Sequence, residues 1–237
     1  MLSKRALAET AEERLAPLKA RRDPSAVLVN EVFASLQGES TWAGVPCTFV
    51  RTTGCHLRCV YCDTEHAFHE GSERTVASLV EVVIALGLPL VEVTGGEPLL
   101  QPSVHHLLRA LCERDLTVLL ETSGAVSLEG VDPRVRVILD VKTPGSGEGA
   151  RHVAANLPRL VPGKDEVKLV LCSEDDYRFA RDLLSRGSIP AGVTVLMSAA
   201  APLLSPTELA GWIVRDRLAV RFQVQLHKVL WGDRRGV

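Results

Sequence analysis

Short runs of apolar and β-branched residues recur along the chain and alternate with segments that show the apolar spacing of amphipathic helices. The strand-like runs cover residues 27–33, 47–51, 90–94, 117–122, 135–141, 167–171, 193–197 and 220–225. Helical spacing, with apolar residues every three or four positions, covers residues 78–87, 104–114, 175–187 and 206–216. This alternation predicts an α/β fold whose strands pair in parallel through right-handed crossovers, as an open sheet or a barrel.

The ends of four predicted strands carry polar residues. In parallel α/β folds ligands bind at the C-terminal ends of the strands. We therefore expect these side chains to face one common cleft: Arg51, Thr94, Glu121 and residues 140–142.

The first 22 residues are rich in charge and precede the first strand-like run. We expect residues 1–25 to form a helical or partly ordered arm and residues 26–237 to form a single domain. The predicted helix ends near Asp23, because a proline follows it and disfavours helical geometry at the residue before.

Composition narrows the class of ligand. The chain has 237 residues, is 46% hydrophobic and carries a formal net charge of -2. Such a balance gives no reason to expect nucleic acid or a membrane surface as the main partner, so small molecules are favoured. The start of the chain lacks the apolar run of a signal peptide, and we expect a cytoplasmic protein.

Three of the six cysteines lie in one short loop, GCHLRCVYCDTEHAF, at the spacing CxxxCxxC: Cys55, Cys59 and Cys62. In a reducing compartment such a group indicates metal binding or catalysis. A structural zinc site is one alternative, but it usually joins two pairs of ligands, and the second pair is missing. Three thiolates can instead hold a 4Fe-4S cluster and leave the fourth iron open to a ligand that is not protein.

The cysteine spacing, with the aromatic Tyr61 before the third cysteine, resembles the signature of the radical S-adenosylmethionine (SAM) superfamily. The downstream stretch VTGGEPLL, with Gly95 and Gly96 after a predicted strand, is similar to the GGEP element of that superfamily. The resemblance implies a partial (incomplete) parallel β/α barrel, and a 4Fe-4S cluster whose open iron chelates SAM. The cofactor carries the radical chemistry, so no catalytic side chain is singled out.

The same resemblance implies a set of cofactor contacts. The matching positions lie in the cysteine loop, in GGEP and in the stretches ETSG and DVK, which end later predicted strands. These expected contacts are Tyr61, Cys62, Asp63, Gly95, Gly96, Glu97, Ser123, Asp140, Val141 and Lys142. Taken singly, the ETSG and DVK residues are equally well interpreted as strand-end turns.

Four further stretches, EVFASLQGES, FVRTTGC, CDT and QVQLHK, resemble the 7-carboxy-7-deazaguanine synthase family of 7-deazapurine (queuosine precursor) biosynthesis. The resemblance runs from about Val29 to Lys228. It implies conversion of 6-carboxy-5,6,7,8-tetrahydropterin to 7-carboxy-7-deazaguanine with loss of ammonia, assisted by Mg²⁺. The chain departs from the family at Ser40, where glycine is common, and at Asp140 and Val141, where Ser-Pro is common.

The implied substrate contacts combine a hydrogen-bonding edge for the pterin with a cation for its carboxylate, to which the planar fork of Arg51 is suited. The expected contacts are Leu36, Gln37, Gly38, Glu39, Arg51, Thr94 and His227. Thr64 is the expected Mg²⁺ ligand, in keeping with an ion that retains waters and uses substrate oxygens. Each of these residues also has a structural alternative. The substrate stretches could form surface turns, Thr64 could be a helix N-cap, and His227 could be a hydrogen-bonded core histidine.

The family resemblance also implies a homodimer and an electron donor such as flavodoxin. Two alternatives stay open at this point. A glycyl-radical-enzyme activating enzyme shares the cysteine spacing but acts on a protein. A zinc-binding interaction module would be no enzyme and would have no need of GGEP.

Overall fold

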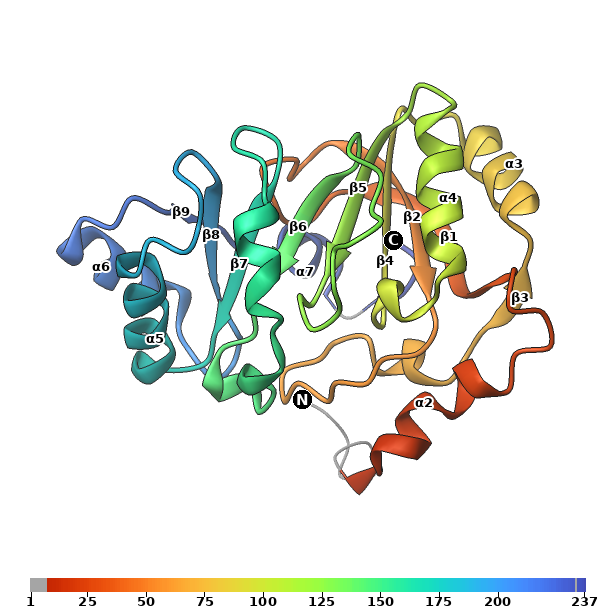
Figure 1. Ribbon diagram of the computed structural model, residues 1–237. Helices are drawn as coiled ribbons and strands as arrows, with labels where there is room; N and C mark the ends of the chain where they lie inside the picture. Colours follow the sequence, from red (N-terminus) through yellow and green to blue (C-terminus); the bar gives the residue numbers. More distant parts are fainter. Residues whose placement is uncertain (1–7, 233) are drawn as a thin grey trace.

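A nine-stranded sheet in the order β3-β1-β2-β4-β5-β6-β7-β8-β9 forms the centre of the protein (Figure 1). The computed structural model describes residues 8–232 and 234–237. β3 and β9 lie at opposite edges, so the described strands do not close into a full barrel. The strands are β1 (Val27–Leu36), β2 (Pro46–Thr52), β3 (Ser72–Arg74), β4 (Leu90–Gly95), β5 (Thr117–Thr122), β6 (Arg136–Asp140), β7 (Glu166–Leu171), β8 (Thr194–Ala199) and β9 (Arg221–Phe222).

Strand direction divides the sheet into two parts. From β2 to β9 every neighbouring pair is parallel. β1 pairs antiparallel with both β2 and β3 and extends one edge. The predicted partial parallel β/α barrel is confirmed, with this antiparallel extension added.

α-Helices lie in four of the connections that lead to parallel strands and cover the front face of the sheet in Figure 1, whereas the short C-terminal helix lies behind it. The helices are α2 (Ala11–Lys19), α3 (Val76–Leu86), α4 (Ser103–Cys112), α5 (Glu174–Ser185), α6 (Pro206–Asp216) and α7 (Leu226–Trp231). Local sequence sets their ends: the Thr75 hydroxyl accepts a hydrogen bond from Ser78 N at the start of α3, and Gly87, with φ of +71°, ends it.

Residues of alternate parity face opposite sides of the parallel strands. Val91 and Val93 of β4 join the main core beneath the helices, as do Val137 and Leu139 of β6. Residues of the other parity face inward. Those nearest the N-terminal ends of the strands are apolar and form a second core: Cys47, Phe49, Leu90, Leu119 and Ile138. Nearer the C-terminal strand ends, the inward positions become polar and open onto a cleft.

All eight predicted strands are present, although the last is shorter than expected. Residues 221–222 pair with β8, and beyond them only the bond from Gln223 N to Met197 O continues the pairing, at 2.9 Å. The four predicted helices are also present, whereas β3 and α7 were not predicted. The N-terminal helix spans residues 11–19 behind a Thr10 capping box, and the first seven residues of the predicted arm lie outside the described residues. Within the described part of the chain, no helix has the length and apolar character needed to cross a bilayer.

Candidate active site

A cleft of about 280 Å³ opens at the C-terminal ends of the parallel strands. It brings together nearly every residue expected from the sequence. The expected residues that line it are Leu36, Gln37, Gly38, Glu39, Arg51, Cys55, Cys59, Tyr61, Cys62, Asp63, Thr64, Thr94, Gly95, Gly96, Ser123, Asp140, Lys142 and His227. Two expected residues, Glu97 and Val141, do not line it.

The three clustered cysteines lie in the loop that follows β2, and all three are free thiols. Cys55 and Cys59 are buried among Leu57 and Phe68, and a hydrogen bond of 2.9 Å from Cys62 N to Cys59 O tightens the turn between the last two. Burial raises the pKa of all three thiols, that of Cys62 to about 11. The thiols therefore hold their protons at neutral pH, and a metal that binds them must displace those protons.

The three thiols are placed as a 4Fe-4S cluster would require. In such a cluster each thiolate binds a different iron. Cys55, Cys59 and Cys62 all line the one cleft, so a cluster bound there could reach all three.

The glycine pair at the end of β4, Gly95 and Gly96, allows the strand end to lie directly against the cysteine loop. A Cβ on Gly96 would lie 2.3 Å from Gly54 O and 3.0 Å from Cys55 Cβ. Gly96 N donates to Thr52 O at 3.0 Å, and Glu97 N donates to Gly54 O at 2.9 Å. Only glycine fits this close approach between two backbones.

Glu97 is fully buried, and protein groups occupy both of its carboxylate oxygens. One oxygen accepts from Leu99 N at 3.0 Å and Thr122 Oγ1 at 2.8 Å. The other accepts from Ser123 N at 2.8 Å and from the Ser123 hydroxyl. Glu97 therefore ties the end of β4 to the end of β5 and presents no free oxygen to the cleft.

The segment after β6 divides its side chains between two faces. Val141 packs in the helix-side core, which its parity on the strand requires. Lys142 Nζ lies 2.9 Å from Asp140 Oδ2 and 5.6 Å from the centre of the Tyr61 ring. Burial alone would lower the pKa of Lys142, but Asp140 and Tyr61 hold it well above its ordinary value.

A buried lysine not singled out from the sequence stands at the centre of the cleft. Lys168 Nζ lies 3.0 Å from Glu39 Oε2 and 3.3 Å from Asp140 Oδ2, and it also pairs with Glu121. Glu92 is buried next to this charged group, and its carboxyl group accepts from the Gln37 amide. Glu121 was expected at this cleft, whereas Lys168 and Glu92 were missed. Each of the two is a single charged residue inside an apolar strand-like run, and this pattern could have indicated a buried functional charge.

Arg51 lies at the mouth of the same cleft, at the level of Thr94 in the parallel register of β2 and β4. Its Nε donates to Glu31 Oε1 at 2.8 Å, and its guanidinium group lies 5.9 Å from the centre of the Phe33 ring. A planar fork held at Nε in this way can still bind a second acceptor through its outer edge.

The end of the cysteine loop meets the C-terminal segment. Asp63 Oδ2 lies 2.7 Å from Lys228 Nζ, and its other oxygen accepts from the Thr64 hydroxyl at 2.9 Å. Burial would raise the pKa of Asp63, but Lys228 and Thr64 lower it below the ordinary value, so the carboxylate stays ionised. Nearby, His227 lies so close to Gly38 that a Cβ there would be 2.2 Å from His227 Nδ1.

The last residues of the chain also reach the cleft, a placement that the sequence did not predict. Arg234, Arg235 and Val237 line it. Arg235 Nη2 donates to Glu70 Oε2 at 3.1 Å, which fixes this segment beside the cysteine loop.

An incomplete parallel barrel with three free thiols and a glycine pair at the mouth of one cleft defines a radical SAM protein. The Radical SAM superfamily model matches residues 49–143. A 7-carboxy-7-deazaguanine synthase from Chlorobaculum tepidum is 45% identical over 212 residues, which cover 88% of this chain and 96% of the relative. A second, from Koribacter versatilis, is 39% identical over 220 residues, covering 86% and 96%. This chain therefore belongs to the 7-carboxy-7-deazaguanine synthase family.

The solved structures agree with this assignment at the level of the fold. The crystal structure of QueE from Escherichia coli superposes with a TM-score of 0.73, covering 91% of this chain and 99% of that chain at 22% identity. Streptococcus suis SuiB bound to its precursor peptide SuiA matches with a TM-score of 0.53 at 13% identity.

Proposed function

We propose that this chain converts 6-carboxy-5,6,7,8-tetrahydropterin to 7-carboxy-7-deazaguanine with loss of ammonia, as a carbon-nitrogen lyase of queuosine biosynthesis. The observation that carries the proposal is the opening of Cys55, Cys59 and Cys62 onto the same cleft as Gln37 and Arg51. Relatives with this name that are up to 45% identical support it. The alternatives, an activating enzyme that acts on a protein and a zinc-binding module, are not favoured.

The cleft provides a place for each cofactor. The three cysteines would hold the 4Fe-4S cluster, and Gly95, Gly96, Tyr61, Ser123 and Lys142 surround the adjacent space for SAM. When bound there, the cluster and SAM would supply radical chemistry at a C–H bond of the substrate. Burial of this region keeps water and oxygen away from that chemistry.

The substrate contacts follow from charge and hydrogen-bonding capacity. Arg51 offers a planar cation for the substrate carboxylate, and Gln37 and Glu39 offer acceptors and donors for the pterin edge. Thr94 and His227 complete the lining on either side. In this proposal Leu36 and Gly38 contribute backbone groups to the same edge.

Mg²⁺ is the third expected cofactor, and we place it at Thr64. Its hydroxyl lies beside the ionised carboxylate of Asp63, and both residues line the cleft. A single hydroxyl, waters and substrate oxygens suffice for an ion that dehydrates reluctantly.

The proposal extends to organisation and partners. Residues 1–25 form an arm and residues 26–237 the catalytic domain, which acts as a homodimer in the cytoplasm and takes its electrons from a donor such as flavodoxin. Six cysteines without a disulfide among them support a reducing location.

Anaerobic reconstitution tests the proposal directly. The protein is loaded with iron and sulfide and incubated with reductant, SAM, Mg²⁺ and the carboxytetrahydropterin, and mass spectrometry is expected to find 7-carboxy-7-deazaguanine. Cys59→Ala should lose the cluster absorbance, whereas Cys112→Ala, in the distant helix-side core, should keep it. Thr64→Ala should keep the cluster and lower the turnover. A cluster that cleaves SAM but leaves the pterin unchanged would refute the substrate assignment.

A further inference from the structure

The segment before the sheet packs against the loop that carries the three cysteines. We call residues 8–22 the N-terminal clasp. In Figure 1 α2 lies along the lower edge of the molecule, beside the orange loop that follows β2. The sequence predicted only a helical or partly ordered arm here, but charged side chains of this segment contact the cysteine loop, at its backbone and at the Arg58 side chain.

Arg58, between the first two cysteines, is the centre of these contacts. Its side chain is 1% exposed, and its Nη1 donates to Cys55 O at 2.9 Å and to Leu57 O at 2.7 Å. The guanidinium group lies 3.8 Å from the centre of the Phe68 ring. A buried cation thus holds two carbonyl groups of the turn that presents the cysteines.

Glu9 of the N-terminal clasp balances this buried cation. Arg58 Nε donates to Glu9 Oε2 at 2.9 Å, and Arg58 Nη2 contacts the same oxygen. The other oxygen of Glu9 lies 2.8 Å from His69 Nε2, at the far end of the cysteine loop. A buried charge without its partner is strongly unfavourable, so the loop depends on this carboxylate.

A second set of contacts joins the N-terminal clasp to the same turn. Arg14 Nη1 donates to His56 O at 3.1 Å and to Glu148 Oε1 at 3.0 Å. That Glu148 oxygen also accepts from Arg58 N at 2.8 Å. The carbonyl groups of three successive loop residues, from 55 to 57, are therefore held by two arginines.

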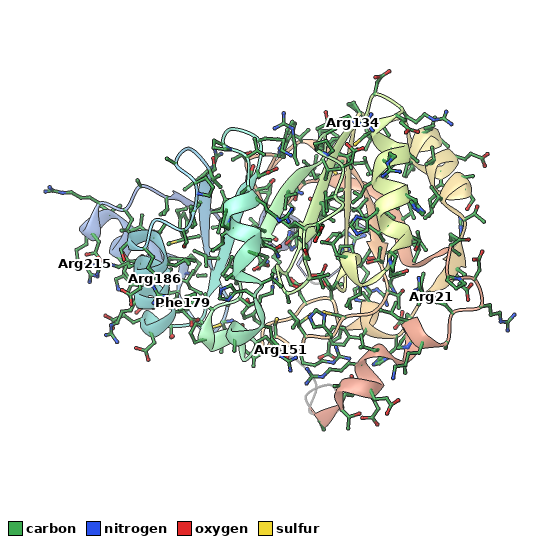
Figure 2. The ribbon with its side chains drawn as sticks, in the orientation of Figure 1. Arg21, Arg134, Arg151, Phe179, Arg186 and Arg215 are labelled. Carbon is green, nitrogen blue, oxygen red and sulfur yellow. The ribbon has the colours of Figure 1, made fainter. Side chains whose placement is uncertain are left out.

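The N-terminal clasp also closes over the residue before the first cysteine. A Cβ on Gly54, whose φ is +93°, would lie 2.8 Å from Leu18 Cγ. Arg21, labelled in Figure 2 near the end of the clasp, donates to Gln101 Oε1 at 3.3 Å and so fixes the clasp to the body of the protein. Gln101 in turn donates to Thr53 O at 3.1 Å, two residues before Cys55.

We propose that the N-terminal clasp holds the cysteine loop in its cluster-binding conformation and sets the charge beside the cluster, with Glu9 and Arg14 as positioning residues. The inference rests on the proposed function only in placing the 4Fe-4S cluster on Cys55, Cys59 and Cys62. Net charge and solvent exposure near a cluster set its reduction potential, and both depend here on Glu9.

The first test uses the metal-free protein and is independent of activity. Glu9→Gln is compared with Glu12→Gln, which removes an 83% exposed carboxylate of the same clasp that pairs with Lys19 on the surface. Iodoacetamide labelling is followed by mass spectrometry at each cysteine. Glu9→Gln should label Cys55 and Cys59 about tenfold faster than wild type, and Glu12→Gln should not.

Two cysteines outside the loop, Cys47 and Cys112, act as internal controls because they lie in the two other cores. Their labelling rates should stay unchanged in Glu9→Gln. Equal rates at Cys55 and Cys59 in the two variants would overturn the inference, and so would a uniform rise at all buried cysteines.

The second test uses the reconstituted protein. In Glu9→Gln the Arg58 cation is unbalanced, which favours the reduced cluster, so the midpoint potential should rise. The loosened cysteine loop should also expose the cluster to solvent, so its absorbance should be lost faster in air. Glu9→Asp, which keeps the charge, should stay near wild type. An unchanged potential in Glu9→Gln would overturn the charge-setting role. If the unmutated protein takes up no cluster, the proposed function fails, and the labelling experiment still decides the role of the clasp.

Discussion

Lys168 Nζ lies 3.0 Å from Glu39 Oε2 in the floor of the cleft. One ammonium group there also contacts Asp140 and Glu121, so a single cation balances three carboxylates that come from different parts of the chain. Burial would lower the pKa of Lys168, but these carboxylates hold it well above its ordinary value. The lysine therefore stays charged, and it both stabilises the fold and shapes the polar floor of the cleft.

Replacing this lysine should be costly. In Lys168→Met three carboxylates lose their common cation, and we expect the free energy of unfolding to fall by about 3 kcal/mol or more, measured by urea denaturation. Lys19→Met removes an exposed lysine that pairs with Glu12 and should change stability by less than about 0.5 kcal/mol. Similar midpoints for the two variants would show that the cleft carboxylates need no cation.

Glu92 should give the stability a pH dependence of known sign. Burial raises its pKa well above the ordinary value, Glu121 raises it further, and Lys168 opposes both. The folded protein thus holds a proton that the unfolded chain releases above about pH 4. The stabilising effect is complete below that pH and is lost as the pH rises towards the folded-state pKa.

Glu92→Gln removes this titration but keeps an oxygen for the Gln37 amide. Urea unfolding of both proteins between pH 4 and pH 8 provides the measurement. The stability of wild type relative to the variant should fall with rising pH, by up to about 1.4 kcal/mol per pH unit. Parallel curves would mean that Glu92 is ionised throughout.

Gly96 should tolerate no side chain. Gly96→Ala places a Cβ 2.3 Å from Gly54 O, so either β4 or the cysteine loop must move. We expect the variant to lose about 1–3 kcal/mol of stability, measured by thermal unfolding. We also expect it to retain the cluster less well, measured by its iron content. Gly211→Ala is the matched control because the new Cβ would meet nothing within 4 Å in α6, and it should raise stability by about 0.5–1 kcal/mol. Full iron retention in Gly96→Ala would contradict the close approach described above.

Glu97 should act through the strand ends and not through direct contact with SAM. Either orientation of the amide in Glu97→Gln turns its NH₂ group towards a backbone N–H, of Leu99 or of Ser123, which leaves that donor unsatisfied. A loss of about 2 kcal/mol in unfolding free energy is expected, whereas Glu113→Gln, at an exposed position, should be neutral. Undiminished stability combined with weak SAM binding would instead favour a direct cofactor contact.

The elements that the sequence predicted best are those with a strong period. Alternating apolar runs located the parallel strands, because strands covered by helices on one face must keep their outward residues apolar. β3 has only three residues and α7 only six, too few for a period to be visible. Both are held by tertiary contacts, such as the bond of 2.9 Å from Leu226 N to Gly38 O.

Within the cleft, sequence resemblance located the cysteines and the substrate stretches but not their electrostatic partners. Lys168 looks like one charge in an apolar run, and its meaning comes from Glu39 and Glu121, which are 129 and 47 residues away along the chain. Glu9 and Arg14 look like parts of a solvated charged helix for the same reason. Long-range charge pairing leaves no local pattern, so only the folded structure reveals it.

Strand parity separates two tasks that a protein engineer would want to treat independently. Outward residues such as Val91 and Leu139 bind the helices, and inward residues such as Glu92 and Asp140 line the cleft. Exchanging an inward side chain leaves the helical core unaltered, so a library confined to the inward positions of β4 to β7 could explore new ring systems as substrates. The charge balance around Lys168 is the constraint that such a library would have to preserve.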